Sequence, residues 1–156
     1  MKKIYRGKSG ELRAILEDEK AKGKTIVFTN GCFDIIHKGH VRYLREAKAL
    51  GDILVVGLNS DSSVRRIKPG RPINNEEDRA EVLSSLEMID YVVIFEEDTP
   101  YEIIKFLRPH VLVKGGDWKV EEIVGSDLVE RTVSLSYVEG VSTTEILKRA
   151  KNAIVD

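Results

Sequence analysis

The feature that most constrains the fold of this chain is a regular alternation of short β-branched runs with longer amphipathic segments from Thr25 onward. Five runs predict strands, over residues 25–29, 52–58, 91–95, 110–114 and 132–137. They are apolar almost throughout, as is typical of strands that are covered on both faces. The pattern therefore predicts an α/β fold with a doubly wound, mainly parallel, five-stranded sheet.

Helical periodicity in the intervening segments predicts the crossover helices of such a sheet. These segments are residues 39–50, 74–87, 99–108 and 142–154. A further amphipathic helix over residues 10–23 precedes the first predicted strand. We expect one domain over residues 1–156, with residues 1–23 as an N-terminal helical extension.

The last predicted helix has a clear start and a clear apolar stripe. Ser142 or Thr143 is expected as its N-cap, because short hydroxyl side chains accept a hydrogen bond from the first turn. Ile146 and Leu147 are expected to face the core.

Composition excludes several classes of protein. The chain has 25 Lys and Arg against 26 Asp and Glu, a balance that gives no field to attract nucleic acid or an anionic membrane. Its single cysteine cannot form an intrachain disulfide, and no apolar run approaches the roughly 20 residues of a membrane span. The N-terminus lacks the apolar stretch of a secretory signal. We expect a cytoplasmic protein with no nucleic-acid or membrane partner.

Polar and glycine-containing segments follow four of the five predicted strands: TNGCFD (29–34), NSDSSVRRIKPGRP (59–72), KGGDW (114–118) and EGVSTTE (139–145). The carboxyl ends of parallel strands meet at one edge of a sheet, so we expect these segments to converge on one crevice. Glycine turns and two helix N-termini supply backbone N–H donors there. The segments also carry five cations: Arg65, Arg66, Lys68, Arg71 and Lys114. This combination is typical of a polyphosphate site.

Two of the three histidines lie three residues apart, in TNGCFDIIHKGH, where a predicted helix begins. A metal pair on one helix usually has i, i+4 spacing and needs a third ligand. A nucleophilic Cys32 would need a general base aimed at it, and a further alternative is that His37 and His40 only cap the helix. We favour phosphate binding, because the helix dipole attracts an anion there and Gly39 lets a ligand approach the backbone. The third histidine, His110, is far away in the sequence.

The motif GCFDIIHKGH resembles the G-x-F-D-x-x-H-x-G-H signature of the nucleotidyltransferase superfamily that includes glycerol-3-phosphate cytidylyltransferase. The later motif GVSTTEI resembles the I-S-T-T signature of the same superfamily. From about Thr25 onward, LNSDSSVRRIK, FEEDTP and LVKGGDW further resemble the adenylyltransferase domains of bacterial ADP-heptose synthesis enzymes. The resemblance implies a Rossmann-like fold and transfer of AMP from ATP to a sugar 1-phosphate, D-glycero-β-D-manno-heptose 1-phosphate, for lipopolysaccharide core synthesis.

The resemblance also implies roles for individual residues. Catalytic roles are implied for His37, His40, Lys68 and Arg79. Nucleotide binding is implied for Thr29, Asn30, Gly31, Cys32, Phe33, Gly39, Lys114, Ser142, Thr143 and Thr144. Substrate binding is implied for Asp61, Arg71, Gly115, Asp117 and Trp118. Asp34 is expected to brace the histidine loop through hydrogen bonds. Mg²⁺ is expected to be carried on ATP, without a protein ligand that we can name.

Departures from the cytidylyltransferase pattern bear on the choice of nucleotide. Those enzymes have R-T-E-G before I-S-T-T, whereas this chain has Tyr137 and Val138 in place of the Arg and Thr, which disfavours CTP. The alternatives are a cytidylyltransferase for glycerol 3-phosphate or a related phosphorylated alcohol, and a nucleotide-sensing module without turnover. The family also makes a homodimer an expectation.

Overall fold

The computed structural model describes residues 1–136 and 142–154. In this part of the chain six strands form one sheet in the order β1-β4-β3-β2-β5-β6, and every neighbouring pair is parallel. The strands are β1 (Ile4–Arg6), β2 (Ile26–Gly31), β3 (Ile53–Asn59), β4 (Tyr91–Phe95), β5 (Val111–Gly115) and β6 (Arg131–Leu135). The doubly wound parallel fold is confirmed, with six strands in place of the five predicted.

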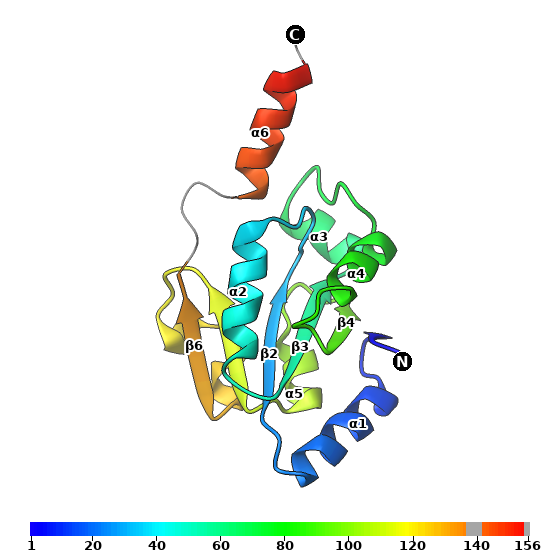
Figure 1. The fold of residues 1–156 in the computed structure, drawn as a ribbon, viewed down its shortest axis with the longest axis vertical. Helices are drawn as coiled ribbons and strands as arrows, with labels where there is room; N and C mark the ends of the chain where they lie inside the picture. Colours follow the sequence, from blue (N-terminus) through cyan, green and yellow to red (C-terminus); the bar gives the residue numbers. More distant parts are fainter. Residues whose placement is uncertain (137–141, 155–156) are drawn as a thin grey trace.

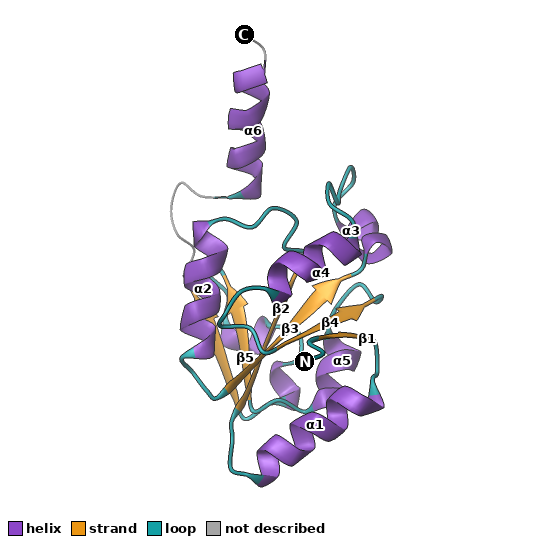
Figure 2. Ribbon diagram, turned by 45° about the vertical axis from the view of Figure 1, so that its right-hand side comes forward, coloured by secondary structure: helices purple, strands orange, loops and turns teal. Residues whose placement is uncertain are grey.

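Helices cover both faces of this sheet, as Figure 2 shows. They are α1 (Gly10–Ala21), α2 (Lys38–Lys48), α3 (Asp61–Ile67), α4 (Glu76–Ser84), α5 (Tyr101–Leu107) and α6 (Thr143–Ile154), with short 3₁₀ turns η1 (Val120–Glu122) and η2 (Ser126–Leu128). Leu44 of α2 and Leu83 of α4 are buried in the core on one face. Leu16 of α1 and Ile104 of α5 are buried in the core on the other. Burial of such side chains is the main stabilising contribution to the fold.

The strand that the sequence pattern missed is β1, which lies at the edge of the sheet beside β4. It has only three residues, too few for an alternating pattern to be recognised. Tyr5 anchors it: the side chain is 4% exposed, and its ring lies edge-on to that of Tyr91 at a centroid distance of 6.1 Å. The N-terminal extension therefore contributes a strand as well as the predicted helix.

The segment after β3 was expected to be a polar loop, but it contains α3. Ser60 caps this helix by accepting a hydrogen bond from the backbone N–H of Ser63 at 3.1 Å. Val64 is the apolar residue of α3 that is fully buried. One buried apolar residue in a helix of seven gives no detectable periodicity, so only the capping serine was available as a signal.

Helix α6 begins where predicted, because the Ser142 hydroxyl accepts a hydrogen bond from the backbone N–H of Glu145 at 3.0 Å. The prediction that Ile146 and Leu147 face the core is wrong: both are only partly buried, and α6 has no buried residue among those described. Figure 1 shows α6 extending away from the sheet, beyond the carboxyl ends of the strands. Tyr137 and Val138, on which the expected preference for ATP was based, lie outside the described residues.

Candidate active site

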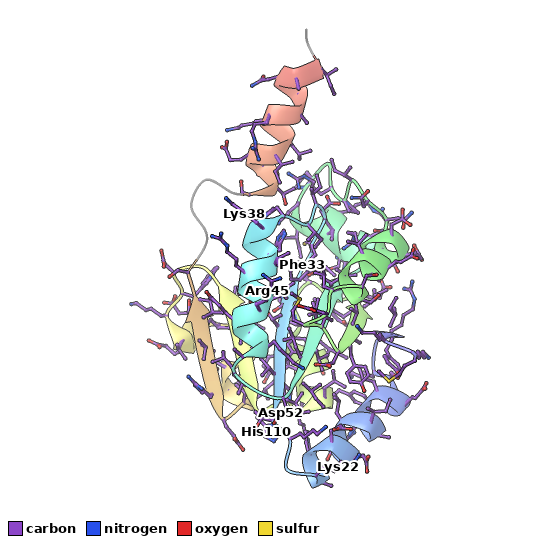
Figure 3. The ribbon with its side chains drawn as sticks, viewed as in Figure 1. Lys22, Phe33, Lys38, Arg45, Asp52 and His110 are labelled. Carbon is purple, nitrogen blue, oxygen red and sulfur yellow. The ribbon has the colours of Figure 1, made fainter. Side chains whose placement is uncertain are left out.

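Strand order indicates where a ligand is expected to bind, at the carboxyl edge of the sheet. The chain leaves β2 toward β3 on one side, whereas β5, the other neighbour of β2, is reached only after β4. Ligands of doubly wound sheets bind outside the carboxyl ends of two such strands. Here these ends are Gly31 and Gly115. Figure 3 shows Lys38 toward this end of the molecule and His110 at the opposite end.

The two histidines of the motif form the first turn of α2. His37 is the N-cap, and its Nδ1 accepts a hydrogen bond from the backbone N–H of Gly39 at 3.1 Å. His40 reaches back, and its Nδ1 accepts from the backbone N–H of His37 at 3.3 Å. The imidazole rings stack at a centroid distance of 3.9 Å. The capping alternative is thus part of the structure, and it uses Nδ1 alone.

Both imidazoles have a pKa below the ordinary value for histidine. Burial, followed by the fields of His37 and Lys68, lowers the pKa of His40 to about 4. Burial also lowers the pKa of His37 below its ordinary value. At pH 7 a hydrogen bond from His40 to a phosphate would therefore join a neutral imidazole donor to a charged acceptor.

The turn between β2 and the histidines depends on close packing of Phe33. This residue has φ of +44°, a left-handed conformation that is uncommon for a residue with a side chain. Its ring packs over Gly31, where an added Cβ would lie 2.9 Å from a ring carbon, and it also contacts the ring of His40 at a centroid distance of 5.2 Å. Gly31 thus lets Phe33 fill the turn and support His40.

Arg79 joins the loops of the site from within. Its side chain is fully buried in α4. Nη1 donates to the backbone oxygens of Cys32 and Asn59 at 2.8 Å each, and Nε donates to that of Asn74 at 2.9 Å. Nη2 donates to Asp61 at 2.9 Å. Arg79 was expected to act on the phosphates, but these contacts tie the exits of β2 and β3 to the start of α4.

Asp34 makes the second tie between loops. Its carboxylate accepts from the backbone N–H groups of Ile73 and Asn74 at 2.8 and 2.9 Å, and Arg71 lies 3.8 Å from it. The Asn74 side chain donates to the backbone oxygen of Asp34 in return. These contacts agree with the bracing role expected of Asp34. Asn74 was missed, because nothing in the sequence shows which distant backbone an amide contacts.

The exit of β5 presents an aromatic ring beside a cation. Lys114 Nζ lies 5.1 Å from the centroid of the Trp118 ring, and Trp118 Nε1 donates to the backbone oxygen of Gly115 at 3.1 Å. Burial lowers the pKa of Lys114. Trp118 remains 47% exposed, and Asp117 is exposed beside it. This arrangement presents a ring face, a cation and a carboxylate at the carboxyl end of β5.

The remaining predicted residues differ in accessibility. Thr29 is buried, and its hydroxyl contacts that of Tyr43 and donates to the backbone oxygen of Val113 at 2.8 Å. Asn30, Cys32 and Gly39 are partly buried, whereas Lys68 is exposed. The side-chain hydroxyl of Thr29 is therefore already hydrogen-bonded within the protein.

The first turn of α6 meets the histidine loop. Thr143 Oγ1 donates to the backbone oxygen of Ile35 at 3.5 Å, and Thr144 beside it is exposed. The two helix N-termini that the sequence pattern predicted for the site, those of α2 and α6, therefore lie at the same end of the sheet. Backbone N–H groups at such N-termini attract an anion.

Other polar residues have structural partners. Arg66 donates to Asp98 at 2.6 Å on the surface. His110 Nδ1 accepts from the backbone N–H of Ile26 at 2.9 Å, at the amino end of the sheet. Within residues 1–136 and 142–154, no group of three or more His, Cys, Asp or Glu side chains is placed to hold a metal ion. In the same part of the chain no helix is long and apolar enough to cross a membrane.

Comparison with known proteins identifies the family of this site. The model of the cytidylyltransferase-like family matches residues 28–149, a range that contains both signature motifs and every loop of the crevice. The chain belongs to the cytidylyltransferase-like family. It is 58% identical over 143 residues to the bifunctional protein HldE of a Nitratiruptor species, covering 91% of this chain and 31% of that protein. It is 59% identical over 128 residues to HldE of Aliarcobacter butzleri, covering 81% of this chain and 27% of that protein.

Solved structures share the fold of this chain. A lipopolysaccharide core biosynthesis protein from Thermoplasma volcanium has a TM-score of 0.65 and 31% identity, covering 75% of this chain and 100% of that one. The pantoate-beta-alanine ligase from Francisella tularensis shares the fold at 13% identity and a TM-score of 0.62, covering 97% of this chain and 77% of that one. This chain spans less than a third of the length of each of the two HldE proteins.

Proposed function

We propose that this protein transfers AMP from ATP to D-glycero-β-D-manno-heptose 1-phosphate, giving ADP-heptose and pyrophosphate. The observation that carries the proposal is the first turn of α2. Two histidines lie there at a helix N-terminus, at the carboxyl edge of the sheet where β2 is paired with both β3 and β5. Such a site binds a polyphosphate. The choice of heptose rests on the identity of 58% to a bifunctional protein HldE and on the KGGDW segment.

The reaction is an in-line displacement at phosphorus. An oxygen of the sugar phosphate forms a new bond to the α-phosphorus of ATP, while the bond from that phosphorus to the oxygen bridging the β-phosphorus breaks. The bonding electrons leave with pyrophosphate. The nucleophile is already an anion, so no general base is needed, and catalysis consists of alignment and charge stabilisation.

The residues of the crevice divide these tasks. His37 and His40 donate to the triphosphate, with His40 assigned to an α-phosphate oxygen, and backbone N–H groups of Gly31, Cys32 and Phe33 face the phosphates. Ser142 and Thr143 hold the β- and γ-phosphates at the N-terminus of α6. Lys68 and Arg71 add positive charge.

The acceptor is assigned to the exits of β3 and β5. Asp61 and Asp117 bind sugar hydroxyls, and the exposed face of Trp118 covers the sugar ring. The hydrogen bond that Asp61 accepts from Arg79 holds its carboxylate in place and leaves its other oxygen for a hydroxyl. Arg79 itself is proposed as a positioning residue, since its contacts are with the protein.

Mg²⁺ is proposed to arrive on the triphosphate, where it would neutralise phosphate charge. The expectations of a homodimer and of a cytoplasmic location belong to the same proposal. Sedimentation of the purified chain tests the first of these, and cell fractionation tests the second.

The function is tested by measuring pyrophosphate release with ATP or CTP against several acceptors in the presence of Mg²⁺. We expect the fastest turnover with ATP and β-heptose 1-phosphate. The α-anomer and glycerol 3-phosphate serve as controls for the acceptor. Faster turnover of CTP with glycerol 3-phosphate would make the protein a cytidylyltransferase, and calorimetric binding of ATP without any product would make it a sensing module.

A further inference from the structure

The two hydrogen bonds that cap α2 determine more than the start of the helix. Each is donated by a backbone N–H group, of Gly39 to His37 and of His37 to His40, and each ends on Nδ1. A nitrogen that accepts a hydrogen bond carries no proton. A neutral imidazole has one N–H group, so it must then lie on Nε2.

We propose that the α2 cap locks His37 and His40 as neutral imidazoles that bind the triphosphate through Nε2–H alone, before and after ATP binds. Gly39 N–H and His37 N–H are the positioning groups of this lock. The inference rests on the proposed function for the identity of the ligand. The tautomer itself belongs to the protein without substrate.

Protonation of either ring would disrupt the hydrogen bond that its Nδ1 accepts in the cap. An imidazolium has donors on both nitrogens, so its Nδ1–H would face a backbone N–H and the cap would be lost. The rings also stack at 3.9 Å, where two positive charges would repel each other. Loss of the cap opposes a proton on either ring, and the repulsion opposes a proton on both rings.

The surroundings act in the same direction. Phe33 packs against the His40 ring, Lys68 approaches from the segment after α3, and Lys114 is brought to this end of the sheet by β5. The carboxylate of Asp34 is occupied by two backbone N–H groups, and Glu145 is in the first turn of α6. Burial and positive neighbours lower the pKa of His40, in agreement with the geometry.

A neutral pair divides the work of the site in a specific way. The histidines supply directed hydrogen bonds and no net charge, so charge neutralisation is left to Lys68, Arg71 and the dipole of α2. A neutral Nε2–H donor also performs no proton transfer, which suits a displacement in which both the nucleophile and the leaving group are anions.

Nitrogen-15 NMR of histidine-labelled protein tests the lock directly. Long-range proton–nitrogen spectra at neutral pH are recorded for the free protein and for its complex with Mg²⁺ and α,β-methylene-ATP, with His110→Gln to assign the third ring. We expect a protonated Nε2 and an unprotonated Nδ1 for His37 and His40 in both states. A proton on Nδ1 in the free protein, or on both nitrogens in the complex, would overturn the proposal.

A matched pair of variants separates the two nitrogens in the assay of AMP transfer. His40→Asn keeps an acceptor near the position of Nδ1 but has no donor near the position of Nε2. His40→Gln keeps a donor near the position of Nε2. We expect kcat to fall at least about a hundredfold in the first and about tenfold less in the second. The kcat/KM profiles of wild type and His40→Gln should run parallel between about pH 6 and about pH 8. Equal losses of kcat in the two variants would show that a charged imidazole is required. A kcat/KM profile that changes with pH for the wild type and stays flat for His40→Gln would show the same.

The two proposals fail separately. If the chain transferred another nucleotide, the free-state NMR spectrum would still report the tautomer. If the tautomer were Nδ1–H, AMP transfer to heptose 1-phosphate would still be measurable. The NMR arm uses the wild-type chain, so it does not depend on whether either variant folds.

Discussion

The thiol of Cys32 lies in the turn between β2 and the two histidines, where a nucleophile would be well placed. Burial raises its pKa, so the thiol is protonated at pH 7 and a poor nucleophile. Its backbone oxygen, which any residue would supply, accepts from Arg79.

We therefore expect Cys32→Val to keep substantial AMP-transfer activity and to change the free energy of unfolding by about 1 kcal/mol or less. Steady-state kinetics and urea unfolding measure the two effects. Loss of turnover in a folded variant that still binds ATP would indicate covalent catalysis and contradict direct displacement.

The pKa of His40 predicts how stability depends on pH. The folded-state value of about 4 lies below the ordinary 6.5, so the unfolded chain takes up this proton first as the pH falls. The contribution of neutral His40 is fully present above about pH 6.5 and is lost as the pH falls toward about 4.

Urea midpoints at about pH 7.5 and about pH 5 should therefore drop further for the wild type than for His40→Asn, which has no proton to take up. Carboxylates titrate in both proteins and cancel in the comparison. Identical drops would mean that His40 is not held neutral in the folded protein.

Among the elements of the fold, the guanidinium of Arg79 connects the paired exits of β2 and β3 to the start of α4. It satisfies the backbone oxygens of Cys32, Asn59 and Asn74 and the carboxylate of Asp61. Removing such a buried cation leaves its partners without donors in a dry environment.

Arg79→Met is expected to lower the free energy of unfolding by about 3 kcal/mol or more, and Arg79→Lys by less, because one ammonium reaches only some of these acceptors. The matched control is Arg66→Met, which removes a surface pair with Asp98 and an exposed hydrogen bond to the backbone oxygen of Glu96. It should change stability by about 1 kcal/mol at most. Denaturant unfolding measures all three. If Arg79→Met changed the free energy of unfolding only slightly, other contacts would have to hold these loops together.

Helix α6 and its N-cap carry two residues proposed for the triphosphate site, Ser142 and Thr143, but the helix adds no buried residue to the core. None of its described residues is buried, and Thr143 makes its hydrogen bond to the sheet domain, at the backbone oxygen of Ile35. A chain that ends after residue 141 should therefore unfold within about 1 kcal/mol of the full chain.

The same truncation removes Ser142 and Thr143 and the N-terminal dipole of α6, so we expect at least about tenfold weaker binding of ATP by calorimetry. Ser142→Ala with Thr143→Ala in the full chain is the control that separates the hydroxyl groups from the helix. Unchanged ATP affinity after truncation would exclude α6 from the triphosphate site.

The sequence alone was enough for the parallel sheet and for the helix start at the histidines. These features depend on local periodicity and on motifs of adjacent residues, which are visible in one dimension. The strand β1 and the helix α3 escaped because each has too few apolar residues to show a period. Tyr5 and Val64 identify β1 and α3 only once the folded chain shows that both side chains are buried.

Tertiary structure decided what the polar residues do. The sequence places Arg79 in a helix directly after three acids, as a surface cation would be, yet the fold buries it against the backbone oxygens of Cys32, Asn59 and Asn74. It equally lowers the pKa of His40, because the burial responsible comes from residues brought together by the sheet. Residue type and spacing determine which groups are available for chemistry. Burial and long-range hydrogen bonds, which depend on the three-dimensional arrangement, determine their charge and their partners.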